Sequence, residues 1–157
     1  MKKTIFALSA VVLVLGLMGC SKNSVKQKIK IGVIQLVEHP ALDASYKGFV
    51  DGLSEAGFID GENISIDYQN AQNEQANCVT IANKLVNDKD DLIFAIATPA
   101  AQAVANLTKD IPILVSAVTD PESAKLVKSN AKPDTNVSGT SDLTPVAAQI
   151  KLLKQIV

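Results

Sequence analysis

The chain has 157 residues, of which 47% are hydrophobic, and a formal net charge of −1. This length suits one compact domain, and the nearly balanced charge gives no reason to expect a nucleic-acid partner. The sequence contains no arginine, the usual residue for bidentate phosphate or carboxylate recognition, so an anionic ligand must be held by backbone amides, hydroxyl groups or lysine.

The first 19 residues have the pattern of a secretory signal peptide, with Lys2 and Lys3 before an apolar run from Ile5 to Met18. This run is shorter than the roughly 20 apolar residues of a membrane-spanning helix. It ends in Leu17-Met18-Gly19-Cys20, which resembles the lipobox of bacterial lipoproteins. The resemblance implies cleavage before Cys20, diacylation of its thiol, and an extracytoplasmic protein anchored to the cell membrane by lipid. The alternative is an ordinary signal peptide followed by a chance cysteine.

Residues 20–29 form a polar tether without a core pattern. The part after the signal peptide keeps 13 lysines and all 16 acidic residues, so its side-chain charge is −3. If Cys20 carries lipid, Cys78 has no partner for an intrachain disulfide. Cys78 lies on an apolar helical stripe, which favours a place in the core over a nucleophilic role.

Short runs rich in β-branched residues predict strands, and apolar residues at helical spacing predict helices. The predicted strands are 30–36, 64–68, 91–97, 113–118 and 137–140, and the predicted helices are 42–53, 78–85, 99–107, a short one at 121–127, and a last one from 145. This alternation predicts an α/β fold, a Rossmann-like doubly wound parallel sheet. By analogy with other such sheets, we expect the strand order 2-1-3-4-5.

Ligands of open parallel sheets bind beyond the carboxyl ends of the strands. The first strand leads into a loop that offers Gln35 or Glu38 to a ligand amine, with Asp43 at the start of the next helix. Glu38, His39 and Asp43 also suggest a metal site. However, the chain has one histidine, so a zinc site of usual composition is not expected, and we predict no metal.

The third strand leads into Thr98-Pro99-Ala100-Ala101, where threonine suits an N-cap and proline the first helical position. The free amides and the positive end of the helix dipole suit a carboxylate or a phosphate, and Thr98, Ala100 and Ala101 are therefore candidate ligand contacts. The alternative is a well-capped helix with nothing bound.

The fourth strand ends at Thr119 and Asp120, which offer a hydroxyl and a carboxylate to the same cleft. Asp120-Pro121 is equally a helix-capping pair. The fifth strand ends at Ser141 and Asp142, which either contact the ligand or belong to a hinge loop.

Catalytic and cofactor motifs are missing from the sequence, which has no Gly-x-Ser-x-Gly elbow, His-Glu-x-x-His, Cys-x-x-Cys, phosphate loop or dinucleotide fingerprint. We therefore predict no catalytic residues and no cofactor. A lipid-anchored enzyme that uses the His39 loop is the alternative from another class.

The segments around 34–43, 95–102, 118–121 and 136–142 resemble the extracytoplasmic substrate-binding lipoproteins of ABC transporters, above all the family that binds tryptophan, tyrosine or phenylalanine. The resemblance implies a two-lobe periplasmic-binding-protein fold that closes on an amino acid and docks on a membrane permease. Only the first lobe, residues 30–144, is expected here, with 145–157 starting the crossover to a second lobe that is absent. An alternative ligand is a sugar, a nucleoside or another small metabolite, sensed or transported.

The same resemblance assigns roles to individual residues. The helix start at Thr98, Ala100 and Ala101 would receive the ligand carboxylate, and Glu38 and Asp120 are candidates for its amine. Ser141 and Asp142 would make a further contact near the boundary between the lobes.

Overall fold

The computed structural model describes residues 28–156. Five parallel strands form one sheet in the order β2-β1-β3-β4-β5. The strands are β1 (Ile29–Gln35), β2 (Ile64–Asn70), β3 (Leu92–Ile96), β4 (Ile113–Val118) and β5 (Val137–Ser141). The predicted α/β class and strand order are thus confirmed. The expected signal peptide, the lipidated Cys20 and most of the tether lie outside the described residues.

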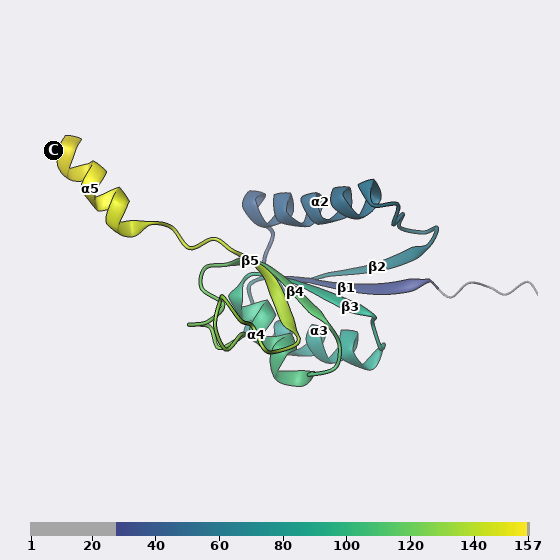
Figure 1. The fold of residues 1–157 in the computed structure, drawn as a ribbon. Coiled ribbons are helices and arrows are strands. Elements are labelled where there is room, and N and C mark those ends of the chain that lie inside the picture. The colour runs from purple at the N-terminus through teal and green to yellow at the C-terminus, as the bar shows by residue number, and fades with distance from the viewer. Residues whose placement is uncertain (1–27, 157) are drawn as a thin grey trace, which may run out of the picture.

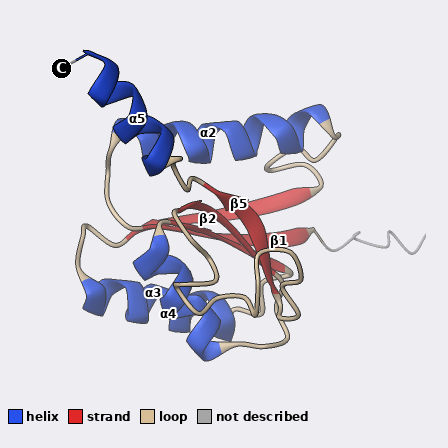
Figure 2. Ribbon diagram, turned by 60° about the vertical axis from the view of Figure 1, so that its left-hand side comes forward, coloured by secondary structure: helices blue, strands red, loops and turns tan. Residues whose placement is uncertain are grey.

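Helices cover both faces of the sheet, as Figures 1 and 2 show. Helix α2 (Pro40–Glu55) lies on one face, and α3 (Gln75–Asn87) and α4 (Thr98–Leu107) lie on the other. This division follows from right-handed crossovers, because the chain moves from β1 to β2 in one direction and from β2 to β5 in the other. Helix α5 (Val146–Ile156) extends away from the body (Figure 1). Within the described residues, no helix has the length and apolar character needed to cross a membrane.

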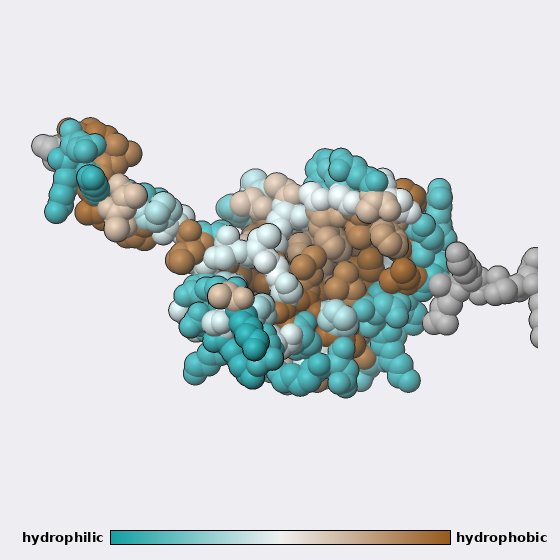
Figure 3. Space-filling view, in the orientation of Figure 1, coloured by the Kyte–Doolittle hydropathy of each residue, from teal (hydrophilic) through white to brown (hydrophobic). Residues whose placement is uncertain are grey.

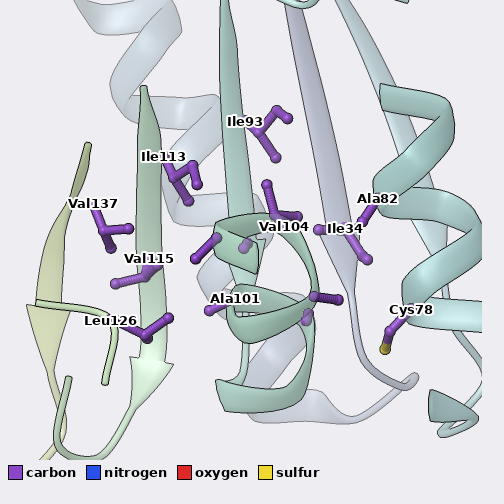
Figure 4. Close-up of a cluster of buried hydrophobic side chains, with 14 of the residues drawn as sticks. Ile34, Cys78, Ala82, Ile93, Ala101, Val104, Ile113, Val115, Leu126 and Val137 are labelled. Atoms are coloured by element: carbon purple, nitrogen blue, oxygen red, sulfur yellow. The ribbon is translucent and has the colours of Figure 1, made fainter. Parts of the chain in front are cut away.

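The main core lies between the sheet and the pair α3 and α4, where Figure 4 shows side chains from both layers pointing toward one another. Ile34, Ile93 and Val104 are fully buried there. Cys78 is buried in the same cluster, and burial raises the pKa of its thiol, so its predicted core position is confirmed.

The opposite face carries a thinner core beneath α2 alone. The predicted apolar stripe of this helix, which includes Leu42, Phe49 and Leu53, packs on the sheet, and the Phe49 ring stacks on Phe94 with centroids 4.2 Å apart. Yet none of the α2 residues is buried. The helix ends before Gly57, whose φ of +85° is the left-handed conformation that commonly follows a helix.

The predicted short helix at 121–127 is wrong. The segment folds as consecutive turns, in which the Ala124 amide donates to the Asp120 carbonyl oxygen and the Leu126 amide to that of Pro121. Lys125 adopts a φ of 60°, and a residue in this left-handed region interrupts a right-handed helix.

Asp90 is a buried carboxylate at the amino-terminal edge of the sheet, 7% exposed, and its Oδ2 has no hydrogen-bond partner among the described residues. Burial, as the largest cause, and the charges of Asp67 and Asp88 raise the pKa of this carboxyl to about 6, although Lys84 and Lys30 oppose the shift. Because the pKa is higher in the folded state, the unfolded chain loses this proton first as the pH rises. The free energy of unfolding therefore falls between about pH 4 and pH 6.

We expect Asp90→Asn to stabilise the fold by about 2 kcal/mol at pH 7.5 and to have almost no effect near pH 4, where the native carboxyl is neutral. Urea unfolding at the two pH values measures the difference. The matched control is Asp91→Asn, which removes the charge of an exposed carboxylate that accepts from the Lys30 amide at 2.8 Å and is expected to give no stabilisation at either pH. Equal effects of Asp90→Asn at both pH values would contradict the assignment.

Gly139 allows β5 to lie close to β4 where the register between them shifts. A Cβ at this position would lie 2.1 Å from the Val115 carbonyl oxygen and 2.7 Å from its amide nitrogen, both backbone atoms that cannot turn aside. We expect Gly139→Ala to lower the free energy of unfolding by about 2 kcal/mol or more. Ser138→Ala on the same strand is the control, and thermal denaturation should separate the two variants clearly.

Candidate ligand-binding site

The carboxyl edge of the sheet contains a topological switch point between β1 and β3. The chain leaves β1 toward α2 on one face and leaves β3 toward α4 on the other, and open parallel sheets bind ligands in the crevice at such a switch point. The Leu36 amide donates to the Ile96 carbonyl oxygen at 3.3 Å and joins the two strand ends at this point. The residues predicted for the site all end or follow strands at this edge: Gln35, Glu38, Asp43, Thr98, Ala100, Ala101, Thr119, Asp120, Ser141 and Asp142.

Gln35 lies beneath the site, because its side chain is fully buried. Its Nε2 donates to Asp43 Oδ1 at 2.6 Å and to the Val37 carbonyl oxygen at 2.9 Å. With both hydrogens used, Oε1 is an acceptor, and it has no donor among the described residues. Gln35 therefore ties the β1–α2 loop to the first turn of α2 and reaches a ligand only if this loop moves.

Glu38 in the loop after β1 and Asp43 in the first turn of α2 both lie at the surface. His39 is the N-cap of α2, where its Nδ1 accepts a hydrogen bond from the Ala41 amide at 3.2 Å. Among residues 28–156, no three side chains of the kinds that bind metals are grouped so that they could hold an ion. The Tyr68 phenol lies near this loop, and its pKa is raised by burial and by the charges of Asp43 and Glu38.

Helix α4 begins one residue earlier than predicted. Thr98 is its first residue and Ala97 is the cap, with φ 83° and ψ 152°. This conformation is rare for any residue other than glycine, and strain of this kind is commonest at functional sites. The Ala97 amide donates to the Ser116 carbonyl oxygen at 3.0 Å, which holds the turn in place against β4.

The start of α4 offers fewer accessible groups than the sequence predicts. The amides of Thr98 and Ala100 have no acceptor among the described residues, and Pro99 has no N–H. Ala100 and Ala101 are fully buried, so their methyl groups belong to the core. Thr98 is half-buried, and its amide and hydroxyl are the polar groups of this helix start that remain as candidate ligand contacts.

The ends of β4 and β5 are joined by a hydrogen bond from Ser141 Oγ to the Thr119 carbonyl oxygen at 2.6 Å. The Asp142 amide donates to the Val118 carbonyl oxygen at 3.3 Å, and the Leu143 amide donates to Ser141 Oγ at 3.2 Å. Ser141 therefore fixes the path of the chain as it leaves the sheet, while the side chain of Asp142 is exposed.

Asp120 closes the turn after β4. Its carboxylate accepts hydrogen bonds from Ser123 Oγ at 2.5 Å, Asn130 Nδ2 at 3.0 Å and the Glu122 amide at 3.1 Å. The bonds from Ser123 and Asn130 lower the pKa of this carboxyl and keep it charged. Asp120 thus stabilises the turn and also places a negative charge at the carboxyl edge of the sheet.

Three hydroxyl groups that the sequence did not single out connect α2 with β4 and β5. Ser45 Oγ donates to Ser116 Oγ at 2.8 Å, and Thr140 Oγ1 lies 3.5 Å from the same atom. The next residue on β4, Ala117, has a φ of 55°. The sequence carries no local signal for these contacts, because the hydroxyls come from three separate elements.

Comparison with known proteins gives consistent results. Residues 30–157 match the family model described as ABC transporter substrate binding protein. The chain is 52% identical over 153 residues to the tyrosine-binding protein of Clostridioides difficile (strain R20291), and the match covers 89% of this chain and 44% of that protein.

Two solved structures share the fold at high sequence identity. A ligand-free, open structure of a substrate-binding protein with adhesive properties from Clostridium difficile is 62% identical with a TM-score of 0.76, covering 80% of this chain and 42% of the other. A structure of an ABC domain in complex with L-Trp from Streptococcus pneumonia is 46% identical with a TM-score of 0.77, covering 82% of this chain and 43% of the other.

The chain spans less than half the length of each of these three proteins. The shared fold confirms the prediction of a Rossmann-like lobe of the periplasmic-binding-protein type. The match over residues 30–157 establishes the family: the chain belongs to the substrate-binding proteins of ABC transporters.

Proposed function

We propose that this chain is a ligand-binding lobe of an ABC importer's extracytoplasmic component, and that it captures an aromatic amino acid for a membrane permease. The observation that carries the proposal is the switch point between β1 and β3, where the half-buried helix start at Thr98 and the loop with the exposed Glu38 follow adjacent strands. The likeness to a tyrosine-binding protein and to a structure with bound L-Trp supports an aromatic ligand.

An α-amino acid presents a carboxylate and an ammonium group a few ångströms apart. The amide and hydroxyl of Thr98, together with the positive end of α4, suit the carboxylate. Glu38 and Asp43 on the β1 side and Asp120 on the β4 side suit the ammonium group, and Asp142 provides a further charge at the edge. Thr119, Ser141 and the buried Gln35 hold these loops through the hydrogen bonds described above.

Attachment to the membrane through lipid on Cys20 completes the proposal and rests on the sequence alone. A binding lobe tethered by residues 20–29 stays within reach of a permease. The proposed role is capture and delivery without catalysis. His39 has a structural role as the cap of α2, which gives the enzyme alternative no support.

Binding to an isolated lobe of this type should be weak, because closure of two lobes on the ligand supplies further contacts. We expect L-tryptophan, L-tyrosine or L-phenylalanine at millimolar concentration to shift amide resonances of Thr98 and of residues 36–43 in two-dimensional NMR spectra. Sugars and nucleosides are the comparison ligands. If only sugars or nucleosides shift these amide resonances, the amino-acid proposal is wrong and the metabolite alternative replaces it.

We predict that Thr98→Asp weakens amino-acid binding at least fivefold, because it places a negative charge where the carboxylate binds. The variant should keep its stability, since an acidic residue in the first turn interacts favourably with the helix dipole by about 0.5 kcal/mol. Thr98→Asn is the uncharged control of the same shape.

NMR titration gives both affinities, and thermal denaturation checks the fold. Equal affinities of the Asp and Asn variants would refute the carboxylate site. Thr98 suits this test better than Ala100, because a charge at the fully buried Ala100 would also disrupt the core.

A further inference from the structure

A groove of about 530 Å³ lies on the side of the sheet opposite α2, and all of its lining residues lie between positions 75 and 137. The connections on this side follow the order of the strands, so α4 lies between α3 and the segment 119–136 that joins β4 to β5. Figure 3 shows apolar surface gathered over the strands below α2, whereas the part of the molecule that contains α3 and α4 is mainly hydrophilic. The volume of the groove is within the roughly 300–1,000 Å³ of small-molecule sites.

The short side chains of α4 leave room for this groove between bulkier neighbours. Ala103 and Ala105 line it and are buried, so the helix backbone lies close beneath the groove. Val79 on α3 and Leu107 at the end of α4 add exposed apolar surface. No aromatic residue lines the groove. The apolar part of the lining is therefore small, and a ligand must be recognised mainly through the polar groups around it.

Hydrogen bonds between α4 and the segment after β4 hold the groove in shape. Gln102 Nε2 donates to the Ala124 carbonyl oxygen at 3.0 Å. Beyond the other end of α4, Asn136 Nδ2 donates to the Ile111 carbonyl oxygen at 2.8 Å. Gln102, Ala124 and Asn136 all line the groove. Because these bonds fix its sides without a ligand, little ordering is needed on binding.

The charge of the groove is unusual for this chain, which has 16 acidic residues. No acidic side chain lines the groove, whereas Lys109 and Lys125 do. Neither lysine forms an ion pair among residues 28–156. Lys109 donates to the Ala105 carbonyl oxygen of its own helix. Lys125 has a φ of 60°, a strained conformation of the kind that is commonest at functional sites. The groove therefore has a positive charge that the described chain does not neutralise.

We propose that this groove binds an anionic saccharide, a sugar that carries a carboxylate or a phosphate. The ammonium groups of Lys109 and Lys125 suit the anion. Sugar hydroxyls both donate and accept hydrogen bonds, as do the carboxamides and the one hydroxyl that line the groove: Gln75, Gln102, Asn106, Asn136 and Thr135. The proposal is independent of the ligand at the switch point and of the proposed function.

The lack of aromatic residues narrows the class of ligand. A nucleotide would have no ring on which its base could stack, which favours a saccharide over a nucleotide. A neutral sugar would also lack a stacking surface and would gain nothing from the two lysines. The groove therefore suits a ligand that has both hydroxyl groups and a negative charge.

The first test is an NMR titration of the full chain carrying Cys20→Ser, which prevents lipid attachment, at physiological ionic strength. D-glucuronate and D-glucose 6-phosphate are the probes, and D-glucose and inorganic phosphate are the controls. Both probes should shift the amide resonances of Asn106, Lys125 and Asn136 and bind at least tenfold more tightly than either control. Glucuronate that binds no more tightly than glucose, or phosphate that binds as tightly as the probes, would overturn the proposal. Shifts confined to Thr98 and residues 36–43 would also overturn it, because the sugar would then bind at the switch point.

The charge is tested by Lys125→Asn, which should weaken glucuronate binding at least fivefold. Asparagine tolerates the left-handed conformation of this position, so the fold should be kept, and thermal denaturation checks this. Lys132→Asn removes the same charge from the same segment, outside the groove lining, and should change the affinity less than twofold. Equal affinities of these two variants would contradict a specific role for Lys125 and overturn the site.

The hydroxyl-binding part of the groove is tested by Asn106→Ala, which removes an exposed carboxamide from α4 and should weaken glucuronate binding at least threefold. Asn83→Ala, at an exposed position of α3 outside the groove, is the matched control and should leave the affinity unchanged. Equal affinities of these two variants would overturn the assignment of a saccharide.

The same ligand chemistry has two sources, a free sugar acid or the end of a glycan chain. Titration with D-galacturonate and with its linear trimer separates them in the same Cys20→Ser chain. Tighter binding of the trimer supports the site and assigns it to a glycan, and equal affinity supports the site and assigns it to the free sugar. Absence of binding by both would overturn the proposal.

Discussion

The pairing of β1 with β3 is the constraint on which the site depends. Five residue pairs from Ile31–Leu92 to Gln35–Ile96 hold the two strands side by side, although an entire strand and two helices separate them in the chain. Because the chain leaves β1 and β3 toward opposite faces, no single helix covers both strand ends. The position of the candidate site is therefore a consequence of topology. The candidate contacts on either side, the β1–α2 loop and the start of α4, are brought together by this pairing.

Backbone conformation at the same edge shows how the lobe directs its groups toward the crevice. Ala97 and Ala117 both have positive φ values, and both follow or end central strands at the carboxyl edge. The surrounding hydrogen bonds and the buried strands β3 and β4 must compensate for this strain, which is of order 1–3 kcal/mol for each residue. The buried core thus holds Ala97, and with it the first turn of α4, in a backbone conformation that alanine rarely adopts.

The sequence predicted the layers well because β3 and the helical stripes are encoded by apolar periodicity, which requires no tertiary information. It placed the start of α4 one residue late, since nothing in the residue type of Ala97 indicates a φ of 83°. It failed at 121–127 for the same reason, because Lys125 has no local mark of a left-handed conformation. For the candidate site, the sequence predicted only which loops contribute residues, and not the contacts between them. The bond between Gln35 and Asp43 and the contacts of Ser45 with Ser116 join different elements, so they follow from packing and are not visible in the sequence.

In the proposed site, the absence of arginine from this chain has a consequence for selectivity. The attraction for a carboxylate comes from peptide dipoles and one threonine, which together act as a fraction of a positive charge. Glu38, Asp43, Asp120 and Asp142 lie at the same edge and repel anions. A ligand with a carboxylate alone would therefore gain little, whereas a zwitterion satisfies both the helix start and the acidic loops. In the proposed site, this balance would favour amino acids over phosphates or simple carboxylic acids.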